Sequence, residues 1–167
     1  QLVDNRLREV AAEVTIAAPV ELVVDHHAFW RTHDAVVGGQ KVAADICYED
    51  TFGEEIARAA RGSTVLVNVS NLAWFGRTFA PWQHLQMSQM RALETGRMML
   101  RATNTGVTAI IDRNGRVVSQ LPLFTAGMLQ GEVRGYAGET PFMRWLNAPV
   151  LALWGGLAVL VLWRAGR

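Results

Sequence analysis

The chain has 167 residues, half of them apolar, and a formal net charge of +1. This length suits one ordinary domain, and the balanced charge argues against a basic surface for nucleic acid. A single cysteine, Cys47, excludes an internal disulfide and a cysteine-rich zinc site. The chain begins at Gln1 with no signal-peptide pattern, so we expect it to be part of a longer protein.

The N-terminal segment, residues 1–38, stays unassigned from the sequence. Leu7 to Val14 predict a short helix, and the run Val20–Val24 predicts a strand. Three histidines follow: His26, His27 and His33. No further ligand stands at a suitable spacing, so we predict that these histidines hold no metal.

The next segment places the cysteine at the end of a strand. Gly38 and Gly39 predict a turn, and residues 41–46 predict a strand that ends at Cys47. A helix follows to about Ala60, with Asp50 or Thr51 as its expected cap. A thiol between a strand end and a helix N-terminus is well placed to ionise and act as a nucleophile. The alternative is a buried structural cysteine.

The rest of the chain alternates strands and helices before a meander. A loop is expected at residues 71–80, and a helix runs from Trp82 to about Leu100, with Pro81 in its first turn. Strands are predicted at residues 63–69, 101–103, 107–112, 116–120 and 128–133, with a hairpin turn at 113–115. This order indicates an α/β layered fold.

Some polar residues allow two interpretations each. Asp45 shares a strand face with Cys47, where a carboxylate would raise the thiol pKa, or it is a solvated strand-end residue. His84 is an alternative base for Cys47. Glu94 and Arg101 are expected to form a structural ion pair at the contact between helix and sheet.

The C-terminal stretch is apolar enough to cross a membrane. Residues 148–163 carry no charge, and Trp145 and Trp163 stand near the ends of a predicted transmembrane helix at 144–163. Arg164 and Arg167 follow at once, which predicts a cytoplasmic C-terminus and places the preceding domain on the outer side. The alternative is a buried core helix or an interfacial helix.

Several motifs follow one another in a specific order. They are Cys47-Tyr48-Glu49, Asn68–Gly76, Pro81–His84, Met90–Glu94, Arg101–Gly106 and Ile111–Gly115. In this order they resemble the C-terminal third of the bacterial apolipoprotein N-acyltransferases, which are membrane-anchored members of the nitrilase superfamily. The resemblance covers about residues 40–163, including the last apolar helix, whereas residues 1–37 do not resemble the family.

The resemblance implies part of a nitrilase-type α-β-β-α sandwich over residues 39–140, followed by the transmembrane helix. Cys47 would take an acyl group from a phospholipid as a thioester, without a cofactor. It would pass this group to the N-terminal amine of a diacylglyceryl-cysteine apolipoprotein. The implied location is the inner membrane, with a periplasmic catalytic domain. The implied residues are Tyr48 and Glu49, which support the oxyanion and the pocket, and Asn71, Trp74 and Phe75, which contact substrate.

The family's catalytic glutamate and lysine have no counterpart in this sequence. Lys41 is the only lysine, and it lies six residues before Cys47 on the same predicted strand, so we do not assign it the role. Three hypotheses remain: an acyltransferase within a longer protein, a soluble-type nitrilase or amidase, and an inactive fragment. The apolar C-terminal helix argues against the soluble enzyme, and the upstream reading frame would separate the other two.

Overall fold

The computed structural model describes residues 8–17 and 33–167. The strand predicted at Val20–Val24 and the histidines His26 and His27 lie outside these residues. The strands are β1 (Arg8–Ala17), β2 (His33–Val37), β3 (Gln40–Ile46), β4 (Val65–Ser70), β5 (Met98–Thr103), β6 (Ala109–Ile111), β7 (Val117–Gln120) and β8 (Met128–Ala137). The helices are α1 (Gly53–Ala59), α2 (Ala80–Thr95), α3 (Pro141–Trp145) and α4 (Ala148–Ala165), with short 3-10 helices η1 (Cys47–Thr51) and η2 (Ala73–Phe75).

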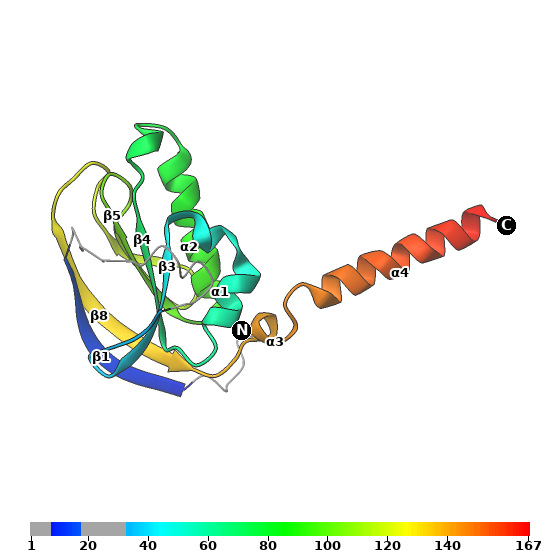
Figure 1. The fold of residues 1–167 in the computed structure, drawn as a ribbon, viewed down its shortest axis with the longest axis horizontal. Helices are drawn as coiled ribbons and strands as arrows, with labels where there is room; N and C mark the ends of the chain where they lie inside the picture. Colours follow the sequence, from blue (N-terminus) through cyan, green and yellow to red (C-terminus); the bar gives the residue numbers. More distant parts are fainter. Residues whose placement is uncertain (1–7, 18–32) are drawn as a thin grey trace.

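Two sheets build the domain. Six strands form a mixed sheet in the order β2-β3-β4-β5-β6-β7, and β1 pairs with β8 in a second sheet. Strands β3, β4 and β5 are parallel, and β2, β6 and β7 join them in antiparallel pairs. Helices α1 and α2 lie on one side of the larger sheet, and β1 and β8 lie on the other (Figure 1).

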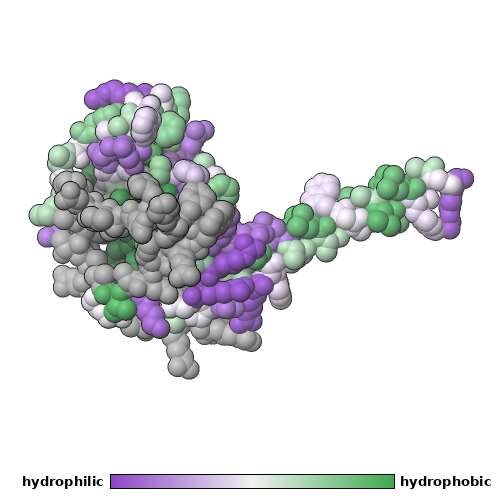
Figure 2. Space-filling model, viewed as in Figure 1, coloured by the Kyte–Doolittle hydropathy of each residue, from purple (hydrophilic) through white to green (hydrophobic). Residues whose placement is uncertain are grey.

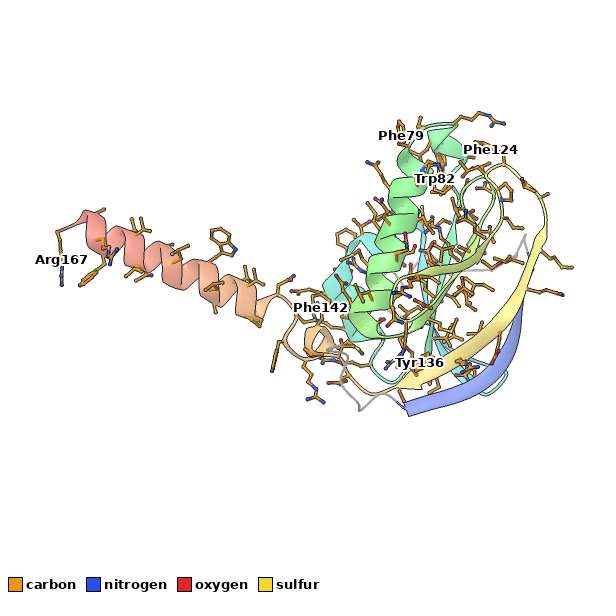
Figure 3. The ribbon with its side chains drawn as sticks, turned by 180° about the vertical axis from the view of Figure 1, so that it is seen from behind. Phe79, Trp82, Phe124, Tyr136, Phe142 and Arg167 are labelled. Atoms are coloured by element: carbon orange, nitrogen blue, oxygen red, sulfur yellow. The ribbon has the colours of Figure 1, made fainter. Side chains whose placement is uncertain are left out.

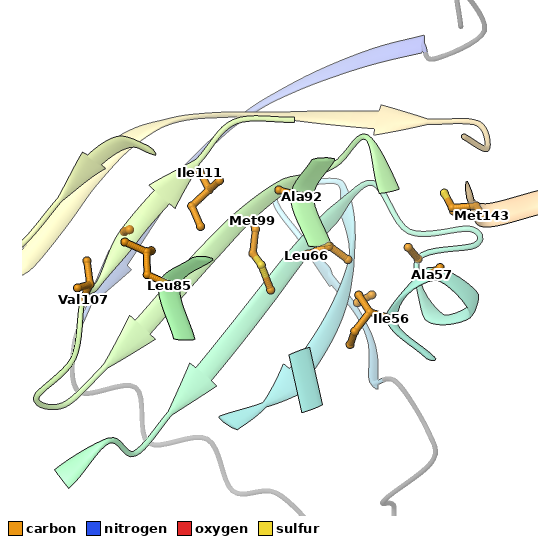
Figure 4. Close-up of a cluster of buried hydrophobic side chains, with 12 residues drawn as sticks. Ile56, Ala57, Leu66, Leu85, Ala92, Met99, Val107, Ile111 and Met143 are labelled. Carbon is orange, nitrogen blue, oxygen red and sulfur yellow. The ribbon is translucent and has the colours of Figure 1, made fainter. Parts of the chain in front are cut away.

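The layers are held by two clusters of buried apolar side chains. One lies between the larger sheet and the helices, and Figure 4 shows its members Leu66, Leu85 and Met99 facing one another. The other lies between the larger sheet and β8 and includes Val65, Leu100 and Val133. Full burial of one such side chain is worth about 1.5–3 kcal/mol. The result is a helix–sheet–sheet arrangement, consistent with part of the expected sandwich.

The predicted helix at Leu7–Val14 is wrong, because these residues belong to strand β1. This strand pairs antiparallel with β8 along its whole length, from Arg8 opposite Ala137 to Ala17 opposite Met128. Val10, Val14 and Ile16 alternate with polar or small residues in the sequence, which is the strand period of two. Pairing with a segment over 100 residues away decided the structure here.

Both predicted helices around the site have different ends in the structure. Helix α1 begins at Gly53 without a side-chain cap, because the chain after Cys47 first forms η1 and the Asp50 side chain turns inward. Helix α2 ends at Thr95, where Gly96 takes φ +64° and its N–H donates to the Ala92 carbonyl. A glycine in this left-handed conformation is a common helix terminator, so the following residues are free to join β5.

Helix α4 extends away from the domain (Figure 1). Its 18 residues are apolar up to Arg164, and none of them is buried against the described residues. Apolar groups colour much of its surface in Figure 2. At 1.5 Å per residue the helix is about 27 Å long, close to the thickness of a hydrocarbon core. Its length and composition therefore fit a transmembrane helix.

Candidate active site

Cys47 lies at the edge of the sheet where β3, β4 and β5 end. It directly follows β3, and its side chain is half-buried. Its φ of +54° is left-handed, a conformation that costs energy for a residue other than glycine. Such strain is characteristic of functional positions. The structure thus supports an accessible thiol at the strand end, in place of a fully buried structural cysteine.

Two side chains hold the peptide group of Cys47 from inside. Its carbonyl oxygen accepts a hydrogen bond from Asn68 Nδ2 at 3.1 Å and another from His84 Nε2 at 3.0 Å. Asn68 is fully buried on β4, and His84 is 8% exposed on α2. Cys47 is therefore held through its main chain by both layers that meet at this edge.

A row of polar side chains crosses the sheet beneath the cysteine. Asp45 on β3 stands opposite Asn68 on β4, and Asn68 stands opposite Arg101 on β5. Asn68 Nδ2 donates to Asp45, and its Oδ1 accepts from Arg101 Nη1 at 3.1 Å. All three side chains are buried, so the solvated alternative for Asp45 is wrong. The register aligns three polar residues that are far apart in the sequence.

Asp50 completes this network from η1. Its Oδ2 accepts from Ser88 Oγ at 2.6 Å and from Arg101 Nη1 at 3.3 Å, and its Oδ1 lies 2.9 Å from His84 Nε2. Ser88 stands one turn after His84 on the sheet-facing side of α2. Asp50 is fully buried. Its carboxylate thus pairs with Arg101, and the cap role predicted for it is wrong.

The buried charges shift one another's protonation. Burial raises the pKa of Asp45 well above its usual range, and the hydrogen bond from Asn68 offsets only part of this effect. Burial lowers the pKa of Arg101, while the negative charges of Asp50, Asp45 and Cys47 act in the opposite direction. Folding therefore favours the protonated form of Asp45, and the ion pair beneath the cysteine joins Asp50 to Arg101.

His84 is oriented in the wrong way to act as a base. Its Nδ1 contacts Arg101 Nη2, and a guanidinium can only donate, so Nδ1 is the acceptor. The proton consequently sits on Nε2 and is donated to the Cys47 carbonyl. The nitrogen that could accept a proton faces Arg101 instead of the thiol. The alternative of a Cys–His pair is not supported.

Two further contacts fix η1. Arg91 Nη1 donates to the carbonyls of Asp50 at 2.9 Å and Thr51 at 3.2 Å. Glu49 Oε2 accepts from the Ile46 backbone N–H at 2.6 Å. Arg91 also pairs with Glu94 at 2.9 Å, so the predicted pair of Glu94 with Arg101 is wrong. Glu49 supports the backbone on the N-terminal side of the cysteine.

The sequence-predicted substrate residues lie on the loops at the same sheet edge. Asn71 Oδ1 accepts from the backbone of Ala73 at 3.1 Å and from Asn104 Nδ2 at 2.8 Å, which ties the loop after β4 to the loop after β5. Trp74 is 84% exposed and Phe75 is 48% exposed. Tyr48 in η1 is also exposed, and its ring lies edge-on to the ring of Phe52, which stands between η1 and α1.

Sequence reasoning missed two aromatic residues that extend this exposed group. Phe79 is 83% exposed and Trp82 is 43% exposed. Figure 3 shows both at the end of the domain where α2 begins, near Phe124. We call Trp74, Phe75, Phe79 and Trp82 the aromatic surface. Their spacing around Pro81 was the available signal, because large aromatic residues in a loop are rarely left without a partner.

Other expectations concern metals and lysine. Among the described residues, no group of His, Cys, Asp and Glu side chains is arranged to hold a metal ion. Lys41 is exposed near the start of β3, whereas Cys47 follows its end. Six residues of strand separate them by about 20 Å. The structure therefore gives Lys41 no part in the site.

Comparison with known proteins identifies the family of this chain. The carbon–nitrogen hydrolase family model matches residues 6–142, and thus begins inside the segment that the sequence left unassigned. The chain is 60% identical over 119 residues to the apolipoprotein N-acyltransferase of Nitrosomonas europaea, covering 71% of this chain and 24% of that protein. It is 59% identical over 130 residues to that of Ralstonia nicotianae, covering 75% and 24%. These matches confirm the resemblance found in the sequence.

A solved structure supports the fold. A carbon–nitrogen hydrolase from Helicobacter pylori G27 aligns with a TM-score of 0.53 at 11% identity, over 59% of this chain and 42% of that one. The chain spans about a quarter of the length of the curated relatives it matches. With the family match over residues 6–142, the fold and the sequence relatives lead to one conclusion: the chain belongs to the carbon–nitrogen hydrolase family.

Proposed function

We propose that this chain carries the nucleophile of an apolipoprotein N-acyltransferase. In this reaction an acyl chain passes from a phospholipid through Cys47 to the N-terminal amine of a diacylglyceryl-cysteine apolipoprotein. The observation that carries the proposal is the half-buried Cys47 at φ +54°, held by its carbonyl above a buried polar network. The relatives with this name, at 59–60% identity, give the substrate class.

The chemistry consists of two acyl transfers. The thiolate attacks the phospholipid ester, a C–S bond forms, and the ester C–O bond breaks as the lysophospholipid oxygen takes up a proton. The amine then attacks the thioester carbonyl, a C–N bond forms, the nitrogen loses a proton, and the C–S bond breaks as the thiolate leaves. The Tyr48 backbone N–H, just after the nucleophile, would donate to the oxyanion. We place the general base and a further donor in the protein outside this chain.

The exposed apolar groups fit a lipid substrate. Asn71, Trp74 and Phe75 stand on the loop next to Cys47, where acyl chains would approach, and α4 supplies a membrane anchor. Arg164 stands in the last turn of α4 and Arg167 follows the helix, so the positive-inside rule puts the C-terminus in the cytoplasm. The catalytic domain would then lie on the periplasmic side of the inner membrane.

An amidohydrolase is the second candidate. Membership of the carbon–nitrogen hydrolase family favours it, since the same thiol could attack an amide and release ammonia. The exposed α4 and the aromatic surface favour the acyltransferase, because a water-soluble substrate needs neither.

The test is to follow acyl transfer in the detergent-solubilised full-length protein. We expect a phospholipid with a labelled acyl chain to label Cys47 through a bond that hydroxylamine cleaves, and a diacylglyceryl-cysteine peptide to remove the label. Cys47→Ala should abolish both steps, while Arg116→Met, an exposed substitution, should leave them unchanged. Labelling that survives in Cys47→Ala would overturn the mechanism. Ammonia release from amides without acyl transfer would favour the second candidate.

We further propose that the isolated 167-residue chain is inactive, because it would lack the base and one oxyanion donor. Measurable turnover by the purified chain would contradict this.

A further inference from the structure

The peptide group between Cys47 and Tyr48 has its two polar atoms on opposite sides. In a trans peptide the C=O and N–H bonds point in opposite directions. The Cys47 oxygen is drawn inward by His84 Nε2 at 3.0 Å and Asn68 Nδ2 at 3.1 Å. The Tyr48 N–H must therefore point away from the buried network. Whatever holds the Cys47 oxygen inward also aims the Tyr48 donor outward.

His84 can donate only because Arg101 fixes its tautomer. Arg101 Nη2 occupies His84 Nδ1, which leaves the proton on Nε2. Arg101 is itself fixed, since it is fully buried and donates to Ser88 Oγ at 2.6 Å and to Asp50 Oδ2 at 3.3 Å. The direction of the His84 hydrogen bond is thus set by a buried charge pair.

We propose that His84 is a positioning residue that aims the oxyanion donor. Its Nε2–H holds the Cys47 carbonyl inward and so keeps the left-handed φ of +54° and the outward direction of the Tyr48 N–H. This inference rests on the proposed function, in which the Tyr48 N–H stabilises the tetrahedral intermediate. A purely structural histidine would instead affect every property of the site together.

Two substitutions separate the contacts of His84. A glutamine amide reaches the place of Nε2, so His84→Gln keeps a donor to the Cys47 carbonyl. An asparagine amide reaches only the place of Nδ1, so His84→Asn keeps the acceptor for Arg101 and loses the contact with Cys47. The two variants differ by one methylene group and in which partner they retain.

Two reactions of Cys47 report different properties. Acylation by a phospholipid passes through an oxyanion, whereas alkylation by iodoacetamide is a direct displacement that forms none. Both are measured in the solubilised full-length protein by mass spectrometry of the tryptic peptide Val42–Arg58, which contains Cys47 between Lys41 and Arg58. The ratio of the two rates isolates the oxyanion donor from exposure of the thiol and from unfolding.

We expect His84→Asn to lower the ratio of acylation to alkylation about tenfold to a hundredfold, because losing an oxyanion donor outright costs about 100- to 1,000-fold. His84→Gln should keep the ratio within about threefold of wild type. Equal ratios in the two variants, whether both high or both low, would overturn the role of His84. If His84→Asn does not fold, His84→Met replaces it, and a low ratio in folded His84→Gln overturns the proposal. A wild-type protein that forms no thioester would contradict the proposed function itself.

Discussion

The N-terminal, outer end of α2 and its inner, sheet-facing side reverse the usual distribution of polar and apolar groups. Where the helix begins, the aromatic surface leaves Trp74 and Phe79 more than four-fifths exposed. One turn further, His84, Ser88 and Arg91 are buried against the sheet and η1. Ordinary soluble domains place these classes the other way round. The outer end of α2 thus exposes apolar side chains, and the inner face holds the backbone of η1.

The inner face of α2 buries an ion pair, and this burial opposes folding. Burying a carboxylate and a guanidinium together costs desolvation that their attraction only partly repays, so such pairs are weak evidence of stability. Here Asp50 and Arg101 are both fully buried, and their hydrogen bonds lead to the Cys47 carbonyl through His84. The apolar clusters around Leu66 and Leu100 stabilise the fold, and the polar network holds the backbone of Cys47.

The largest effect should come from breaking the charge pair. Arg101→Met leaves the Asp50 carboxylate buried without a cation, so the free energy of unfolding should fall by about 3–5 kcal/mol. Thermal unfolding in detergent, followed by tryptophan fluorescence, measures this. The control Arg116→Met removes an exposed arginine and should change stability by less than about 0.5 kcal/mol.

Removing both charges tests whether Asp50 and Arg101 act as a pair. Asp50→Asn together with Arg101→Met leaves no buried ion, so the double variant should be more stable than Arg101→Met alone. If the loss of stability in the double variant equals the summed losses of Asp50→Asn and Arg101→Met, the two residues do not act as a pair.

The next effect concerns α4, the second exposed apolar part of the molecule. Leu157→Arg places a charge near the helix centre, which opposes membrane insertion by about 2.5–3.5 kcal/mol. We expect fewer full-length molecules to present a C-terminal tag on the cytoplasmic side, as measured by tag accessibility in spheroplasts. Leu157→Ala is the control and should insert normally. Equal insertion of both variants would show that α4 does not cross the membrane.

How much the sequence could predict depends on the range of the interactions. Cys47 at a strand end and the apolar α4 were found because their signals lie in neighbouring residues. Strand β1 was missed because β8 decides it. Asp50 has the local pattern of a helix cap, and only the folded chain brings it next to Arg101. Polar residues flanked by apolar ones within a strand do indicate a pairing or a function, but the identity of their partners depends on the register between strands.

The alignment of Asp45, Asn68 and Arg101 illustrates the limit. Each stands alone among apolar neighbours in its own strand, which marks it as paired or functional. Only the parallel register of β3, β4 and β5 puts them in one row. Glu94 was matched with the wrong arginine for a different reason, since its partner Arg91 stands three residues earlier on the same helix, where the local spacing already allows the pair.

A smaller effect, with the opposite sign, is expected at Asp45, the first residue of this row. Burial raises the pKa of Asp45, so folding favours its protonated form. The stability it contributes is present below the ordinary aspartate pKa of about 3.9 and is lost as pH rises through the raised value. Asp45→Asn keeps an acceptor for Asn68 and cannot ionise. It should therefore be more stable than wild type at pH 7.

The pH dependence identifies the cause. The stability difference between Asp45→Asn and wild type should be small near pH 4 and grow in favour of the variant as pH rises, in paired thermal unfolding experiments. Taking the difference removes the effect of Glu94, whose pKa is raised by burial in the same direction. A constant difference across this range would show that ionisation of Asp45 does not penalise the folded state.

The smallest effect on stability, and the clearest contrast, should come from the aromatic surface. Trp74 and Phe79 make little contact with the folded chain, so Trp74→Ser with Phe79→Ser should change the free energy of unfolding by no more than about 0.5 kcal/mol. The two substitutions would instead remove apolar area that contacts lipid in the proposed function. We therefore expect slower acylation of Cys47 by phospholipid in vesicles, with an unchanged rate of alkylation by iodoacetamide. Met128→Ser, an exposed substitution on β8, is the matched control and should leave acylation unchanged. Equal acylation in both variants would mean that the outer end of α2 is apolar for another reason, while a large loss of stability would place these side chains in the core of the longer protein.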